Sequence, residues 1–458
     1  MLDSDDFLMG VSLSGFQFEM GGKERDTGTD WYRWCTDEIN AYSGLVSGDS
    51  PSNGPNYWEN YEKFHDLAQE AGMDAIRIGI EWSRVFPEET FGLDFDDLGS
   101  VADTESIDHY GKIIRDLKDR GITVMVDLNH FTLPMWAHDP LAINRNRETD
   151  QLGWAADGLP EEFAKYARFT VKKLDEYVDY WSTMNEPNVV AELGYLAPES
   201  GFPPSIISPQ MYEKAFQQQI EAHNLSYEAM KKETDKPVGL IYSTVWFDGD
   251  ETAEHAFAYN NFRFLDPIMD NCDFLGVNYY TRGVVERREK PIRVGSQEID
   301  WRRLPGYGYG CEPNGESRAG RAVSNKGWEF YPEGLAKVLR KLDDRYDKPM
   351  FVTENGIADA LDRQRPLYLL AHLEALESFQ DRIDLNGYFH WSLVDNFEWA
   401  DGFSQRFGLV HVNFDEQVYS PRPSYYVYRE VIARRNLEPF RDLLESLAED
   451  QGYQLPAG

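Results

Sequence analysis

Eight short apolar segments, separated by helical patterns, constrain the fold of this chain more than any other feature. Each is rich in β-branched and aromatic residues and has the length of a strand buried on both faces. Such runs are typical of parallel strands, which helices cover on either side. The predicted strands are 7–14, 74–80, 123–130, 180–186, 237–244, 273–280, 350–354 and 385–393.

Helical periodicity fills the segments between these strands. In 57–71 apolar residues recur every three or four positions until Gly72, and in 106–120 they recur until Gly121. Glycine after the last turn is a common helix stop. Pro160, Pro332 and Pro366 stand near helix starts, where proline is tolerated. The predicted helices are 57–71, 106–120, 160–178, 209–232, 251–270, 332–346, 365–380 and 422–435.

Eight strands alternating with eight helices predict an α/β fold, a (β/α)8 TIM barrel with elaborated loops after its strands. A doubly wound sheet is the main alternative, but no glycine-rich phosphate-binding turn follows the first strand. No linker divides the chain, so we expect one domain over 1–458. The longest loop, 283–325, is rich in Gly and Arg and shows no clear periodicity.

The charge of the chain excludes several classes of partner. Its 458 residues include 80 acidic and 45 basic ones, a formal net charge of −35. So negative a surface repels nucleic acid and anionic lipid, and it disfavours phosphorylated substrates. The acidity, with Arg more frequent than Lys, favours a halophilic cytosol, where salt screens the repulsion. An ordinary acidic protein is the alternative.

Cysteine usage and the N-terminal residues favour a cytoplasmic protein. Cys35, Cys272 and Cys311 are widely spaced and form neither a disulfide framework nor a Cys-x-x-Cys metal motif. Residues 1–6 have no basic segment followed by an apolar one, unlike a signal peptide. No apolar stretch approaches the ~20 residues that span a bilayer.

Two carboxylates at strand ends carry the strongest chemical signal. Chemistry in a barrel lies at the C-terminal ends of the strands. Glu186, in Asn-Glu-Pro, ends the fourth strand, and Glu354, in Thr-Glu-Asn-Gly, ends the seventh. Glycoside hydrolysis needs two facing carboxyl groups, one protonated and one ionised. Arg77 and Tyr280 are expected to keep Glu354 charged, and that charge to raise the pKa of Glu186.

Other interpretations of these residues exist. Asn-Glu-Pro and Glu-Asn-Gly also occur as plain turns, Arg77 as a structural ion-pair partner and His130 as a core histidine. A metal site could use His130 and His138, but no His-x-His or His-Glu-x-x-His spacing supports one. No Gly-x-Ser-x-Gly elbow follows a strand, which argues against a serine hydrolase.

Several long motifs, in order along nearly the whole chain, resemble the β-glycosidases of glycoside hydrolase family 1, most closely their archaeal branch. These motifs are Gly15-Phe16-Gln17, Trp82-Ser83-Arg84, Asn185-Glu186-Pro187-Asn188, Asn278-Tyr279-Tyr280-Thr281, Trp328-Glu329-Phe330, Thr353-Glu354-Asn355-Gly356, His390-Trp391-Ser392, Asn396-Phe397-Glu398-Trp399 and Arg406-Phe407-Gly408.

The resemblance implies a role for each matching residue. Glu354 would be the nucleophile and Glu186 the acid/base, while Asn185 would hold the sugar 2-hydroxyl. Arg77 and Tyr280 would orient Glu354, with Asn278 in support. The remaining site residues would contact the cleaved sugar, with Phe407 at its C6 end, and they are Gln17, His130, Trp391, Glu398, Trp399 and Phe407. The family usually has Trp after the histidine of the third strand, where this chain has Phe131.

The expected activity is that of a cofactor-free, metal-free, retaining exo-β-glycosidase. It would release terminal glucosyl or galactosyl residues from small β-glycosides and oligosaccharides, without a nucleic-acid or membrane partner. Preference for β-xylosides or β-mannosides, transglycosylation, and a non-catalytic sugar-binding role are the alternatives. Archaeal relatives resemble dimers and tetramers, so we expect a homo-oligomer.

Overall fold

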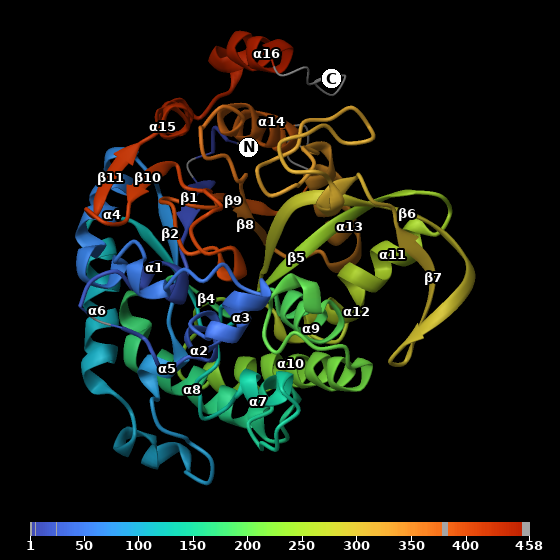
Figure 1. Cartoon of the computed structure of the whole chain (residues 1–458). Coiled ribbons are helices and arrows are strands. Elements are labelled where there is room, and N and C mark those ends of the chain that lie inside the picture. Colours follow the sequence, from blue (N-terminus) through green and yellow to red (C-terminus); the bar gives the residue numbers. More distant parts are fainter. Residues whose placement is uncertain (1, 5, 24, 378–382, 451–458) are drawn as a thin grey trace.

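The computed structural model contains a closed ring of parallel strands, and this confirms the predicted (β/α)8 barrel (Figure 1). The structure describes residues 1–458 except 1, 5, 24, 378–382 and 451–458. Each strand pairs with the next around the ring, and pairing of β5 with β6 closes it. The strands are β1 (Leu8–Ser12), β2 (Ala75–Gly79), β3 (Thr123–Asp127), β4 (Tyr180–Asn185), β5 (Val238–Gly249), β6 (Leu275–Val294), β8 (Met350–Asn355) and β9 (Leu385–His390).

An apolar plug fills the N-terminal end of the barrel interior. It is a cluster of six buried side chains, five in strands of the ring and one directly before β6, namely Ala75, Met125, Ile241, Phe351, Phe389 and Phe274. Alternate residues of a strand face the same side. Arg77, two residues after Ala75, therefore faces the interior one layer closer to the C-terminal end. Polar side chains begin at that layer, so the plug supports the site from below.

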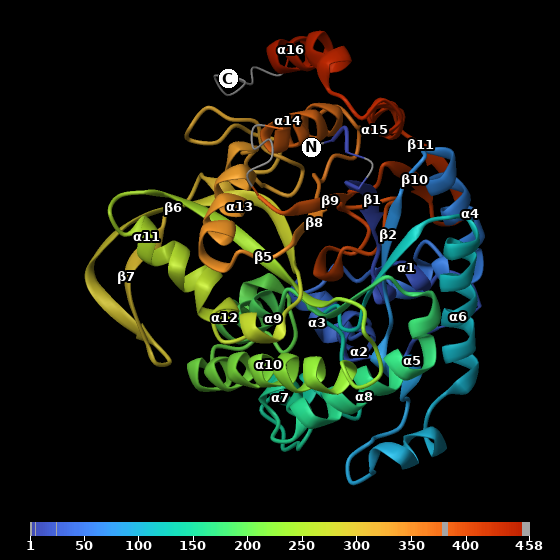
Figure 2. The same ribbon diagram turned by 180° about the vertical axis from the view of Figure 1, so that it is seen from behind.

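Helices surround the ring and bury their apolar faces against it (Figure 2). Gly72 and Gly121 follow their helices at φ +71° and +78°, as the predicted stops require. The helices that follow successive strands are α4 (Tyr57–Glu70), α6 (Thr104–Asp119), α8 (Leu159–Leu174), α10 (Pro209–Met230), α13 (Glu333–Tyr346), α14 (Arg365–Glu377) and α15 (Pro423–Arg434). Residues 378–380 of the predicted 365–380 helix lie outside the described residues.

The helix predicted over 251–270 is present over 253–265, but it is shorter than predicted and is not a regular α-helix throughout. The segment contains α11 (Ala253–Phe257), a π-helical turn over Ala258–Phe262 and the short α12 (Arg263–Leu265). Asn261 lies in the π-helical turn, and its side chain bonds to both the N–H and the carbonyl of Val245 and to the carbonyl of Phe257. Since these bonds tie the helix to β5, they explain the wider turn.

The 283–325 loop also differs from expectation, because its first part is a β-hairpin. Strand β6 continues to Val294, and β7 (Gln297–Arg303) returns antiparallel to it. The hairpin projects away from the ring, at the right of Figure 1 and at the left of Figure 2. Exposed charged residues fill much of it, so the sequence lacks the apolar run that marks a buried strand.

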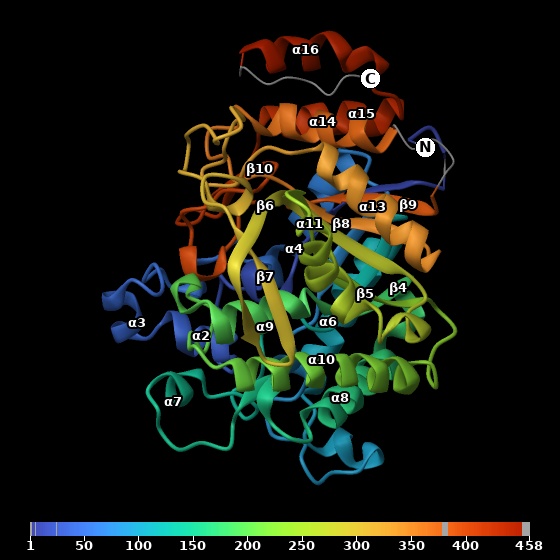
Figure 3. The same cartoon turned by 90° about the vertical axis from the view of Figure 1, so that its right-hand side faces the viewer.

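Further elements lie near the C-terminus. Strands β10 (Val410–Asn413) and β11 (Val418–Pro421) form a small antiparallel sheet. Helix α16 (Arg441–Asp450) packs against α14 on the outside of the molecule (Figure 3). No helix in the described part of the chain is long and apolar enough to cross a membrane.

Candidate active site

Local backbone geometry aims two glutamates into the C-terminal mouth of the barrel. Glu186 directly follows β4 with φ +49°, and its N–H donates to the carbonyl of Ile241 at 2.9 Å. The left-handed conformation of Glu186 costs about 1–2 kcal/mol for a residue with a Cβ. Glu354 lies within β8, where the register against β6 shifts beside Asn278. Such irregularities redirect side chains and are frequent beside active sites.

Two hydrogen-bond donors hold the carboxylate of Glu354. The guanidinium of Arg77, fully buried, forms an ion pair with Oε1. The hydroxyl of Tyr280 donates to Oε2 at 2.5 Å. Burial and the nearby Glu354 charge raise the pKa of Tyr280 well above its usual value, so this hydroxyl stays a donor. Both oxygens of Glu354 therefore act as acceptors, as an ionised carboxylate does.

The environment of Glu186 favours the protonated form of its carboxyl group, unlike that of Glu354. Burial, followed by the charge of Glu354, raises the pKa of Glu186 from 4.5 to about 8. Oε1 of Glu186 accepts from Nδ2 of Asn278 at 2.9 Å, and Ser243 is a second side-chain partner. At neutral pH Glu186 is therefore protonated and able to give up its proton. The expectation that Arg77 and Tyr280 hold Glu354 while Glu186 titrates high agrees with this geometry.

Two asparagine side chains connect the carboxylates across the barrel. Asn278 also donates to Asn185 Oδ1 at 3.0 Å, and Arg77 donates to the same oxygen at 3.2 Å. The hydroxyl of Thr353, beside Glu354, donates to Asn278 Oδ1 at 2.8 Å. Strands β2, β4, β6 and β8 are thus joined by one hydrogen-bond network. Asn185 Nδ2 lies 3.3 Å from Nε2 of His130, which extends the network to the loop after β3.

An aromatic wall lies beside the carboxylates. The imidazole of His130 is nearly parallel to both Trp391 and Trp399, with ring centroids 5.8 Å apart in each case. On another side, Phe407 lies 6.2 Å from Tyr280 between ring centroids. Flat apolar faces with polar edges suit the C–H faces and hydroxyls of a sugar.

A hydrogen-bonded group of polar side chains around Gln17 also lies in the mouth of the barrel. Gln17, in α1 (Gly15–Glu19), donates to Glu398 Oε2 at 3.4 Å and to Asn396 Oδ1 at 3.0 Å. The hydroxyl of Ser14 donates to Gln17 Oε1 at 2.8 Å and fixes the orientation of the amide. All the site residues predicted from the sequence therefore lie in one connected region at this end of the barrel.

The family model for glycosyl hydrolase family 1 matches residues 3–267 and 256–437 of the chain. The chain belongs to glycosyl hydrolase family 1. It is a retaining β-glycosidase of the galactosidase and glucosidase type.

Individual relatives cover nearly the whole chain. The β-galactosidase of Saccharolobus solfataricus is 42% identical over 93% of this chain and 94% of its own. Fpglu1 of Fervidobacterium pennivoraus has a structure with a TM-score of 0.94 at 47% identity, covering 96% of this chain and 98% of its own. The structure of the hyperthermophilic β-glucosidase of Pyrococcus furiosus has a TM-score of 0.91 at 40% identity, covering 97% of this chain and 98% of its own.

Sequence reasoning missed three residues in the site of this family 1 glycosidase. Lys326 contacts Glu398, and Trp328 packs against Tyr280. Both lie in the long loop before α13, where no periodicity marks them, and the Trp328-Glu329-Phe330 motif was given no role in the site. Asp127, at the end of β3, is buried with Oδ2 3.6 Å from Nδ1 of His130, and burial raises its pKa to about 8. An acidic residue inside a predicted apolar strand was a signal that could have identified it.

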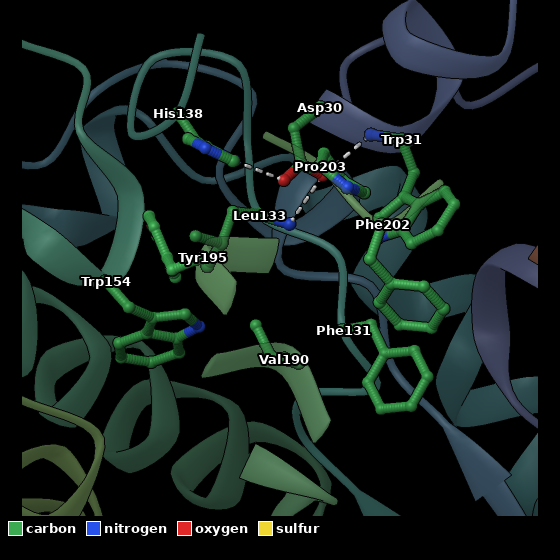
Figure 4. A pocket seen from close by; sticks show the side chains of 10 residues that line it. All are labelled: Asp30, Trp31, Phe131, Leu133, His138, Trp154, Val190, Tyr195, Phe202 and Pro203. Atoms are coloured by element: carbon green, nitrogen blue, oxygen red, sulfur yellow. Dashed lines mark hydrogen bonds and ion pairs between the residues drawn. The ribbon is translucent and has the colours of Figure 1, made fainter. Parts of the chain in front are cut away.

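A small cavity lies behind the aromatic wall (Figure 4). Its lining includes Phe131, which has φ +75° and follows His130. His138, also in the lining, pairs through Nδ1 with Asp30 Oδ2 at 2.7 Å, and Asp30 accepts from the N–H groups of Trp31 and Leu133. These contacts give His138 a structural role. Among the described residues of this glycosidase, no three His, Cys, Asp or Glu side chains are grouped to hold a metal.

Proposed function

We propose that this family 1 enzyme is an exo-β-glycosidase in which Glu354 is the nucleophile and Glu186 the acid/base. It releases terminal glucosyl or galactosyl residues from β-glycosides. One observation carries the assignment of roles: two buried glutamates differ in their partners, since Arg77 and Tyr280 both donate to Glu354 while Glu186 has a pKa near 8. One carboxylate is thus ready to attack and one carboxyl group ready to protonate.

In the first step Glu186 gives its proton to the glycosidic oxygen as the bond from that oxygen to the anomeric carbon breaks. An oxygen of Glu354 forms a bond to the anomeric carbon, and the aglycone leaves as an alcohol. Asn185, held by Arg77 and Asn278, donates to the sugar 2-hydroxyl, a contact that tightens as positive charge develops on the ring.

In the second step Glu186 acts as the base. Esterification removes the negative charge of Glu354, which is the second-largest cause of the high pKa of Glu186. The pKa of Glu186 therefore falls when it must accept a proton. Water gives a proton to Glu186 and its oxygen to the anomeric carbon, and the bond to Glu354 breaks. Another alcohol in place of water gives transglycosylation.

The sugar lies between the aromatic wall and the polar side chains of the mouth in this proposal. The ring packs against Trp391, and its hydroxyls bond to polar groups on the surrounding segments. Those groups and the adjoining aromatic contacts come from Gln17, His130, Glu398, Trp399 and Phe407.

The domain organisation, cellular location, source and oligomeric state of the enzyme are also part of the proposal. A single-domain, cytoplasmic enzyme from a halophilic archaeon agrees with the net charge of −35 and with three unpaired cysteines. A homo-oligomer is favoured by a similar solved structure, described as a β-glucosidase mutant derived from a tetrameric structure.

The test uses 4-nitrophenyl β-glycosides of glucose, galactose, xylose and mannose in concentrated KCl. Wild type should turn over the glucoside or galactoside, and Glu354→Gly should lose activity. Sodium azide should then restore release of nitrophenol from Glu354→Gly with an α-glycosyl azide as product, because azide attacks in place of the carboxylate. In Glu186→Gly, azide should instead give the β-glycosyl azide.

Glu162→Gln is the matched control, since Glu162 is a buried glutamate on α8 that bonds to Thr90 and Lys165. It should keep wild-type turnover. Interchanged azide products would reverse the two roles. Full turnover by Glu354→Gly without azide would reject the proposed nucleophile.

A further inference from the structure

The loop between β7 and α13 carries a lysine into the mouth of the barrel. The hydroxyl of Ser324 accepts from the backbone N–H groups of Lys326 and Trp328, at 3.2 and 3.1 Å. Gly327 lies between them at φ +83°, and a Cβ there would come within 2.6 Å of the carbonyl oxygen of Cys311. A tight turn therefore fixes the backbone from which Lys326 projects.

The ammonium of Lys326 lies among groups of the sugar-binding region. Nζ is 3.1 Å from Glu398 Oε1 and 2.7 Å from Asp401 Oδ2, and it lies 5.2 Å from the ring centroid of Trp328. The side chain is 21% exposed. Burial opposes its charge, but Glu398 and Asp401 outweigh that effect and raise the pKa of Lys326 above its usual value. The group is therefore a permanent cation.

The ammonium of Lys326 has more hydrogen-bond donors than its two carboxylate partners use. An ammonium has three N–H donors. Two point to Glu398 and Asp401, and the described residues provide no hydrogen-bond or ion-pair partner for the third. Glu398 meanwhile divides its oxygens, Oε1 to Lys326 and Oε2 to Gln17. An ammonium and an amide thus flank the same carboxylate.

The position of Trp328 indicates which part of the sugar this donor meets. Trp328 lies under the ammonium and 5.9 Å from Phe407 between ring centroids. Phe407 is the residue expected at the C6 end of the sugar. We propose that Lys326 is a specificity-determining residue whose ammonium donates a hydrogen bond to the hydroxyl on C6. This inference rests on the proposed exo-β-glycosidase function.

A pair of substrates that differ at this hydroxyl tests the inference. A β-D-fucoside is a β-D-galactoside without the 6-hydroxyl. We expect Lys326→Met to lower the ratio of kcat/KM for 4-nitrophenyl β-galactoside to that for the fucoside by about tenfold, since a bond from a charged donor is lost with the galactoside alone. Lys326→Gln, which removes the charge with a smaller change of polarity, should lower the ratio in the same direction.

The control is Lys118→Met. Lys118 makes a similar half-buried ion pair with Asp179, at the start of β4 and thus at the opposite end of the barrel, and its loss should leave the ratio unchanged. Equal losses on both substrates would overturn the inference, because Lys326 would then act only by holding Glu398. Unchanged kcat/KM on both substrates in both variants would also overturn it, although wild-type turnover would leave the proposed function intact.

Discussion

Glu186 and Glu354 are the same residue type, at similar burial, in one mouth, and their surroundings give them different chemistry. Glu354 accepts from a cation and a phenol, whereas Glu186 accepts from a neutral amide. A nearby cation stabilises an ionised carboxylate more than a protonated one, so the proton shared by the two glutamates stays on Glu186. The sequence predicted this division because Arg77 lies within the second predicted strand and Tyr280 ends the sixth. Lys326 could not be predicted, because only the folded loop brings it to Glu398.

This division predicts an alkaline limit to activity. With a β-glycoside of a poorly acidic alcohol, such as lactose, the leaving oxygen needs a proton from Glu186. We expect kcat/KM to fall as pH rises through about 8, where Glu186 loses that proton. A 2,4-dinitrophenyl glycoside, whose leaving group needs no proton, should show a weaker decline. An identical decline of kcat/KM at high pH for the two substrates would contradict the role of Glu186 as the acid.

The high pKa of Glu186 also predicts a cost in stability. An unfolded glutamate ionises near pH 4.5, but the folded state retains its proton to about pH 8. The contribution of this group to stability is therefore present below pH 4.5 and is lost as pH rises through 8. Glu186→Gln should raise Tm at pH 9 relative to wild type, with the gain shrinking toward pH 4. Calorimetry across this range measures it, and a gain independent of pH would contradict the argument.

At the scale of elements, periodicity located the strands and most helices but misplaced several boundaries. The third predicted strand, 123–130, ends in the structure at Asp127, because the chain leaves the ladder before the left-handed Phe131. The β6–β7 hairpin escaped prediction since its exposed charges hide the alternation that Ile299 and Trp301 provide. Asn261 interrupts a helix through tertiary bonds that no local pattern contains.

The π-helical turn gives a prediction at this scale. Asn261→Ala would leave the N–H and carbonyl of Val245 without their side-chain partner in a buried site. We expect a loss of about 1–3 kcal/mol in the free energy of unfolding, measured by urea denaturation. The neighbouring Asn260→Ala, which removes a side-chain bond to Ala256 and an exposed one from Arg303 at a half-buried position, should cost less. Equal costs would argue against Asn261 as the anchor.

At the scale of the whole molecule, net charge governs the response to solvent. A chain with a net charge of −35 repels itself, and salt screens that repulsion. We expect Tm and activity to rise with KCl, as differential scanning fluorimetry and nitrophenol release would record. A flat response from low to molar KCl would contradict the halophilic assignment. Light scattering in the same buffers would give the mass of the assembly and test the homo-oligomer.

The groups proposed to break the glycosidic bond, and those proposed to recognise the sugar, come from different parts of the chain. Arg77, Asn278, Tyr280 and Glu354 belong to strands of the ring and Glu186 directly follows β4, whereas Gln17, Lys326, Glu398 and Phe407 lie on longer segments that follow strands. Mutation can therefore explore new sugars by changing loops while the scaffold of reaction stays constant. A randomised library confined to such loops would keep the same reaction and vary the range of sugars that the enzyme accepts.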